Sequence, residues 1–95
     1  MAIFPLTLYR TYYRQGFFNV TVDYDQYVRK KEGPIILILS TSQQIQGRID
    51  RRANLNATAR IHGGAALRDW FQQHFECNDV VQVDLSRMDC IQMMK

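Results

Sequence analysis

Apolar and polar positions alternate over short segments of this chain, and this pattern predicts a protein built mainly of β-strands. Two early segments, Phe4–Tyr9 and Phe17–Val22, are rich in the aromatic and β-branched side chains that are typical of strands. The continuous apolar run Ile35–Leu39 predicts a strand that is buried on both faces. Further strands are predicted at Gln44–Arg51, Ala57–Ile61, Val80–Leu85 and Met88–Met93.

The alternation within Gln44–Arg51 assigns side chains to the two faces of that strand. Ile45, Gly47 and Ile49 share one face, and Gln46, Arg48 and Asp50 share the other. A polar turn is predicted at Ser40–Gln43, directly before this strand.

Two helices are predicted between the strands. Asp23 is a suitable N-cap for a short helix over Tyr24–Lys30, which Gly33-Pro34 would terminate. The main helix is predicted to begin near Gly64, because four large apolar residues follow at the spacing of one helix face: Leu67, Trp70, Phe71 and Phe75.

The 95 residues are enough for one domain, and we expect residues 1–95 to form it. The order of elements predicts a mainly β fold, a seven-stranded open or pseudo-barrel with two short helices. Closure of the sheet is favoured because it protects strand edges. Asn78 is predicted to adopt a left-handed conformation in the turn before the strand at Val80.

Basic residues are concentrated in stretches that also carry polar hydrogen-bonding side chains. Residues 46–60 hold four basic and one acidic group, whereas residues 61–95 hold three basic and five acidic groups. Such asymmetry indicates a face that binds polyanions, and Arg, Asn, Gln and Thr are the side chains that contact bases and phosphates. We therefore predict DNA contacts from a first arm with its neighbouring strand, Arg10, Thr11, Tyr12, Tyr13, Arg14, Gln15 and Asn19, and from a second arm, Arg48, Asp50, Arg51, Arg52, Asn54, Asn56, Thr58 and Arg60.

Simpler interpretations exist for the same residues. The first arm could be an exposed hairpin turn whose tyrosines belong to the core, and the second a solvated hairpin. Asp50 could serve to orient one of the arginines. Arg60 suits a phosphate contact or a structural ion pair equally well, and Asn19 could cap a turn.

No motif indicates catalysis, a cofactor or a metal site, so we expect a domain that is not an enzyme. Asp23 and Asp25 lack the Glu-x-Lys pattern of metal-dependent nucleases. Cys77 and Cys90 lack further metal ligands and are expected to be reduced thiols in the cytoplasm. The apolar run Ile35–Leu39 is too short to cross a bilayer, and the uncharged first residues argue against a signal peptide.

Five segments occur in an order that is typical of one family. Val20–Val22 leads into the first predicted helix, and Gly33–Leu39 is a glycine followed by an apolar strand. Gln46–Arg60 contains paired strands with a basic loop, Arg60–Gly64 precedes the main helix, and Asn78–Val83 begins a Val-rich strand. Together they resemble the pseudobarrel DNA-binding domain of plant transcription factors, the B-three domain, and its relatives in bacterial restriction endonucleases.

The resemblance implies binding of double-stranded DNA, with two arms in the major groove at the positions of Arg10–Gly16 and Arg48–Asn56. It also implies the target-recognition module of a restriction-type enzyme, or a small regulator, with any cleavage carried by another nuclease domain or subunit. Two alternatives stay open: a protein-interaction or oligomerisation barrel that binds an acidic partner, and a nuclease with an unrecognised site. If Arg51 or Arg52 contacts a base, its replacement by alanine should cost about 1–3 kcal/mol of binding free energy.

Overall fold

The computed structural model describes residues 2–40 and 43–94 of the chain. Within these residues the protein forms seven strands, two α-helices and one 3₁₀ turn. In chain order they are β1 (Ile3–Thr7), α1 (Arg10–Gln15), β2 (Phe17–Asn19), η1 (Asp25–Tyr27), β3 (Gly33–Leu39), β4 (Gln43–Asp50), β5 (Arg60–His62), α2 (Gly64–His74), β6 (Val80–Asp84) and β7 (Cys90–Met94).

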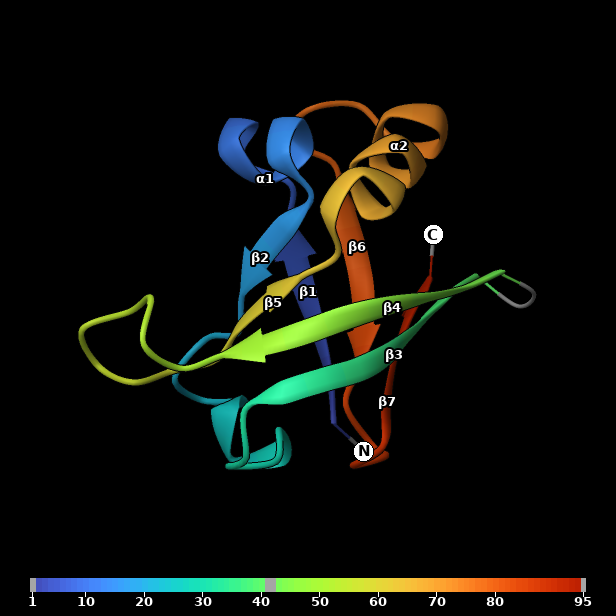
Figure 1. The fold of residues 1–95 in the computed structure, drawn as a ribbon. Helices are drawn as coiled ribbons and strands as arrows, with labels where there is room; N and C mark the ends of the chain where they lie inside the picture. The colour runs from blue at the N-terminus through green and yellow to red at the C-terminus, as the bar shows by residue number, and fades with distance from the viewer. Residues whose placement is uncertain (1, 41–42, 95) are drawn as a thin grey trace.

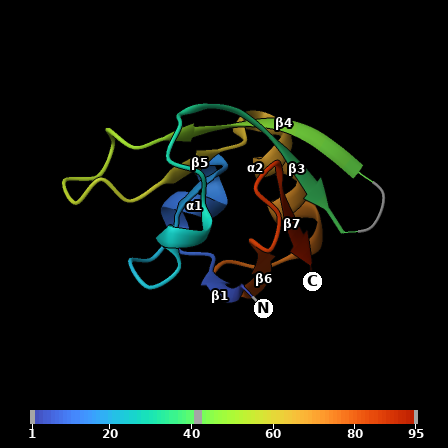
Figure 2. The same cartoon turned by 90° about the horizontal axis from the view of Figure 1, so that it is seen from below.

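The strands form one mixed sheet in the order β1-β6-β7-β3-β4-β5-β2, which curls into a half-barrel (Figures 1 and 2). Strands β3 and β7 pair in parallel, and the other neighbouring strands pair antiparallel. The expectation of a mainly β, seven-stranded open barrel with two helices is therefore confirmed.

The core fills the inside of the half-barrel. Both α-helices lie at the same end of the sheet (Figure 1). Helix α2 buries Leu67, Trp70 and Phe71, as its apolar spacing predicts. The largest fully buried side chains come from all parts of the chain and include Phe4, Leu8, Phe18, Leu37, Ile49, Ile61, Ile91 and Met93. No helix in the described part of the chain is long and apolar enough to span a membrane.

The helix predicted at Tyr24–Lys30 is wrong, because this segment forms only the 3₁₀ turn η1. No side chain caps the turn, and Val28 is already extended. The carbonyl oxygens of Val28 and Arg29 accept hydrogen bonds from the guanidinium of Arg51, at 3.0 and 2.9 Å. In a longer helix these two carbonyls would accept backbone N–H groups from the following turn. Here the side chain of Arg51, distant in sequence, donates to them instead.

The first arm is a helix rather than the expected turn between strands. Helix α1 ends at Gly16, which has a left-handed backbone (φ 75°) and donates its N–H to the Tyr12 carbonyl at 2.9 Å. The Tyr13 hydroxyl donates to the Phe75 carbonyl at 3.0 Å, and this contact joins α1 to the end of α2. Tertiary contacts therefore stabilise a six-residue helix that is too short to stand alone.

Strand β3 is not buried on both faces as predicted. Ile35, Leu37 and Leu39 are buried, whereas Ile36 is 46% exposed. The reason is that the half-barrel has its core on one side only, so the outer face of β3 meets solvent.

Other details of the sheet follow the sequence more closely. Strand β4 buries Gly47 and Ile49, and Asn78 is left-handed at φ 76°, both as predicted. Strand β2 ends at Asn19 and β5 begins at Arg60, so both are shorter than expected. The predicted turn Ser40–Gln43 includes residues 41–42, which lie outside the described residues.

Candidate nucleic-acid interface

Three neighbouring strands, β4, β5 and β2, present polar and aromatic side chains on their outer face. Ile49, Ile61 and Phe18 are fully buried, and because side chains alternate along a strand, the residues on either side of each point outward. The strand register aligns two rows across the sheet, Arg48–His62–Phe17 and Asp50–Arg60–Asn19, which we call the outer-face patch.

Arg60 occupies the middle of the second row and is held by aromatic and amide groups. Its guanidinium carbon lies 4.6 Å from the centre of the Phe17 ring. Its Nε donates to Asn19 Oδ1 at 2.9 Å, and its Nη2 donates to Asn54 Oδ1 at 3.4 Å. Among the described residues Arg60 forms no ion pair with a carboxylate. Its plane is therefore defined while its charge is not neutralised, a suitable state for binding an external anion or base edge.

Asp50 is the carboxylate of the outer-face patch. Its Oδ2 lies 3.8 Å from Arg48 Nη1 and 3.4 Å from His62 Nε2, and its Oδ1 accepts the N–H of Arg52 at 2.8 Å. The hydrogen bond from the Arg52 N–H, with contributions from His62 and Arg48, lowers the pKa of Asp50. Asp50 is therefore ionised at neutral pH and forms an ion pair with Arg48, one of the arginines that it could orient.

The connection between β4 and β5, which we call the 51–59 loop, projects beyond the sheet in both views (Figures 1 and 2). Its base is joined to the patch by amide hydrogen bonds. Asn54 Nδ2 donates to Asn19 Oδ1 and to the Thr58 carbonyl, both at 3.1 Å. Asn56 Oδ1 accepts the Thr58 hydroxyl at 2.8 Å. The structure thus brings Asn19, Asn54, Asn56, Thr58 and Arg60 into one network.

Arg51 is used inside the protein. Its guanidinium donates five hydrogen bonds: two to the Asp25 carboxylate, at 2.9 and 3.0 Å, and one each to the carbonyls of Ala57, Val28 and Arg29. Its side chain is only 13% exposed, and that of Asp25 is 17% exposed. Its Nε is buried without a partner, a cost that the five bonds offset. We therefore assign Arg51 a structural role in place of the DNA contact suggested by its sequence position.

Arg52, the next residue, has the opposite environment. Its side chain is 90% exposed, and its Nε lies 3.5 Å from Glu32 Oε1. An exposed pair of this kind is weak and can exchange its carboxylate for a phosphate at little cost. Arg52 therefore stays available for the contact predicted from the sequence.

Helix α1 meets the patch through one residue. The Tyr12 ring packs edge-on against Phe17, with centroids 5.4 Å apart. Tyr13 instead faces α2, where Gln72 Nε2 donates to its carbonyl at 3.1 Å. The remaining residues of the first arm are exposed, and no hydrogen bond or ion pair within residues 2–40 and 43–94 joins them to the patch: Arg10, Thr11, Arg14 and Gln15.

Two residues of the patch were not among the predicted contacts. Phe17 belongs to the predicted strand Phe17–Val22, and His62 is outside every predicted contact. The centres of the Phe17 and His62 rings lie 5.9 Å apart. The guanidinium of Arg60 lies over the face of the Phe17 ring. Only the pairing of β2 with β5 brings them together, and that pairing spans more than 40 residues of sequence.

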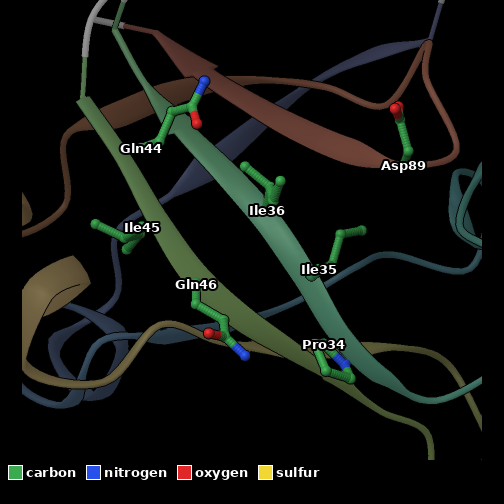
Figure 3. Close-up of a pocket in the computed structure, with 7 residues that line it drawn as sticks. All are labelled: Pro34, Ile35, Ile36, Gln44, Ile45, Gln46 and Asp89. Carbon is green, nitrogen blue, oxygen red and sulfur yellow. The ribbon is translucent and has the colours of Figure 1, made fainter.

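A second surface feature lies beside the patch, on the outer side of β3 and β4. This shallow pocket is lined by both apolar and polar side chains. Figure 3 shows them: Pro34, Ile35, Ile36, Gln44, Ile45, Gln46 and Asp89. The exposed Ile36 is its main apolar contribution.

The described residues contain no group of three His, Cys, Asp or Glu side chains that could hold a metal ion. Cys77 is exposed and Cys90 is buried, both as free thiols, and burial raises the pKa of Cys90. Neither cysteine adjoins the outer-face patch.

No family model, curated protein or solved structure matches this chain. The relation to B-three domains therefore stays a prediction from the ordered sequence segments.

Proposed function

We propose that this domain binds double-stranded DNA with sequence preference, through the outer-face patch and the 51–59 loop. The observation that carries the proposal is Arg60, a guanidinium with a defined plane and no carboxylate partner among the described residues. Arg48 and Arg52 extend the positive charge on either side of it, and Asn19 and Asn54 supply amides. Planar guanidinium and amide groups are those that form paired hydrogen bonds with base edges.

The 51–59 loop is the arm that this proposal uses most directly, because the hydrogen bonds of Asn54 connect it to the patch. We keep α1 as a second arm, whose exposed Arg10 and Arg14 would contact phosphates. In this scheme the domain is the target-recognition part of a restriction-type enzyme or a small cytoplasmic regulator. A separate nuclease domain or subunit would perform any cleavage.

The test begins with selection of a randomised duplex library, followed by fluorescence anisotropy on the enriched sequence at two salt concentrations. We expect a short enriched motif, bound more tightly than scrambled duplex, with affinity that falls steeply as salt rises. Weak binding without enrichment would reduce the proposal to general electrostatic attraction. Cleavage of plasmid by the pure protein with magnesium would instead support the nuclease alternative.

Arg60→Ala is expected to weaken binding to the selected duplex by about 1–3 kcal/mol, because it removes a base or phosphate contact. Arg87→Ala is the matched control, since it removes the same charge from an exposed residue paired with Asp89 on the β6–β7 connection. Anisotropy titrations of both variants at equal salt make the comparison. Equal losses in the two variants would show that only net charge matters.

Asp50→Asn is expected to tighten binding to all duplexes by about two- to fivefold, the scale of an exposed charge interaction. The substitution removes a negative charge beside Arg48, while the amide oxygen can still accept the Arg52 N–H. Titrations of selected and scrambled duplex in parallel measure the effect. Weaker binding would place Asp50 itself in a base contact, where it could accept a hydrogen bond from cytosine.

One observation favours the protein-interaction alternative. Ile36 is 46% exposed and lines the pocket of Figure 3, which suits a partner with an apolar side chain. Ile36→Glu would block such a contact, whereas on the DNA-binding proposal it should leave the motif preference unchanged.

A further inference from the structure

Leu55 is an apolar side chain presented to solvent at the middle of the 51–59 loop. It is fully exposed, while its neighbours Asn54 and Asn56 form hydrogen bonds with the protein. A single exposed leucine is ordinary on a protein surface. Leu55 differs from such a residue because hydrogen bonds fix the loop on both sides of it.

The loop fixes the backbone on both sides of Leu55. The N–H of Ala57 donates to the Asn54 carbonyl at 3.1 Å, which closes a turn around Leu55, and Ala57 adopts a left-handed backbone at φ 63°. Below the turn, Arg51 bonds the Ala57 carbonyl and the Asp25 carboxylate. The leucine is therefore held outward by a preformed turn on an anchored base.

The same contacts place this turn beside the proposed DNA contacts. Asn54, directly before Leu55, is hydrogen-bonded to both Asn19 and Arg60 of the outer-face patch. Figures 1 and 2 show the 51–59 loop extending beyond the end of β4, so a duplex that lies over the patch and continues past this end of the sheet would meet the loop. Leucine is among the side chains that proteins insert between base pairs, where it exchanges water for the faces of the bases.

We infer that Leu55 is a wedge that inserts into one base-pair step of the bound duplex and partly unstacks it. This inference rests on the proposed function and adds a specific residue and a deformation of the DNA to it. A flexible pyrimidine–purine step is the expected site, because such steps unstack most readily. Part of the sequence preference would then come from deformability rather than from hydrogen bonds.

The experiment uses the selected duplex with 2-aminopurine placed at successive positions, and measures its fluorescence and the anisotropy of an end label in the same titration. Wild-type protein is expected to raise the 2-aminopurine signal at one step. Leu55→Ala should abolish that rise while binding weakens by about tenfold or less. Leu55→Met, which keeps an apolar side chain of similar size, should retain the rise.

Val22→Ala is the matched control, because Val22 is also an exposed apolar residue and lines the same surface hollow as Leu55. It should leave both signals unchanged. Tight binding without a fluorescence rise at any step, or a rise that persists in Leu55→Ala, would overturn the wedge and leave the DNA-binding proposal intact. Absence of DNA binding by the wild-type protein would overturn both.

Discussion

Gly16→Ala is expected to destabilise the domain by about 3 kcal/mol, the sum of a left-handed backbone and an overpacked contact. Gly16 has φ 75°, and a Cβ at this position would lie 2.1 Å from the Gly64 carbonyl oxygen and 2.8 Å from the Arg68 nitrogen. These are backbone atoms, so no side-chain rotation relieves the overlap. In a domain of this size the melting temperature should fall by about 12–24 °C.

The destabilisation has a second cause in the way that the two helices meet. The Gly16 carbonyl accepts the N–H groups of Gly63 and Gly64, at 2.9 and 3.1 Å, and so satisfies donors at the start of α2. A shift that accommodates the alanine would stretch these bonds as well.

Gly64→Ala is the matched control for this prediction. Gly64 also has a left-handed backbone, at φ 62°, but a Cβ there would meet no atom within 4 Å. Only the backbone cost of about 1 kcal/mol should appear. Thermal denaturation of both variants measures the difference, and equal melting temperatures would contradict the close packing of α1 on α2.

Arg51→Ala is expected to destabilise the domain by about 3 kcal/mol, since it breaks a largely buried ion pair and leaves its acceptors without donors. The substitution removes four hydrogen bonds that join the 51–59 loop to η1 and the residues after it, and a fifth to the Ala57 carbonyl within the loop. Among the residues that the structure describes, the Asp25 carboxylate would keep only the N–H of Ala59 as a donor. Urea denaturation measures the loss as a lower midpoint.

Arg52→Ala is the control, because the two arginines are adjacent in sequence and differ in environment. The side chain of Arg52 is 90% exposed, so its removal should change the free energy of unfolding by about 1 kcal/mol or less. The two substitutions should affect DNA affinity for different reasons. Arg52→Ala should weaken binding in a stable protein, whereas Arg51→Ala should weaken it only through the disturbed loop.

An Arg51→Ala protein as stable as the wild type would contradict the structural role. If that stable variant also lost preference at one base position, Arg51 would be a base contact, as its sequence position first suggested. The pair of variants thus separates anchoring of the loop from contact with DNA.

The positions of the strands and the buried faces of β4 and α2 could be predicted because each depends on local periodicity. Alternation assigns Gly47 and Ile49 to the core, and helical spacing does the same for Trp70 and Phe71. The left-handed Asn78 follows from its own side chain. None of these requires knowledge of which strands are neighbours.

Helix α1, the single turn η1 and the roles of the arginines required that knowledge. Helix α1 depends on Tyr13 reaching Phe75, and the predicted helix at Tyr24–Lys30 is limited to one turn while Arg51 takes two of its carbonyls. In sequence Arg51 and Arg52 look alike, and Phe17 looks like any strand residue. Their difference arises from partners about 20 to 45 residues away in the sequence.

By itself, the sequence determined that this protein is a small, mainly β domain with polar and basic segments between its strands. Tertiary structure decided which of those basic groups face outward together and which are used to hold the chain. The physical reason is range: periodicity and turn preference act over a few residues. The pairing that aligns Arg48, Arg60 and Phe17 on one face, and that draws Arg51 onto Asp25, exists only when distant strands meet.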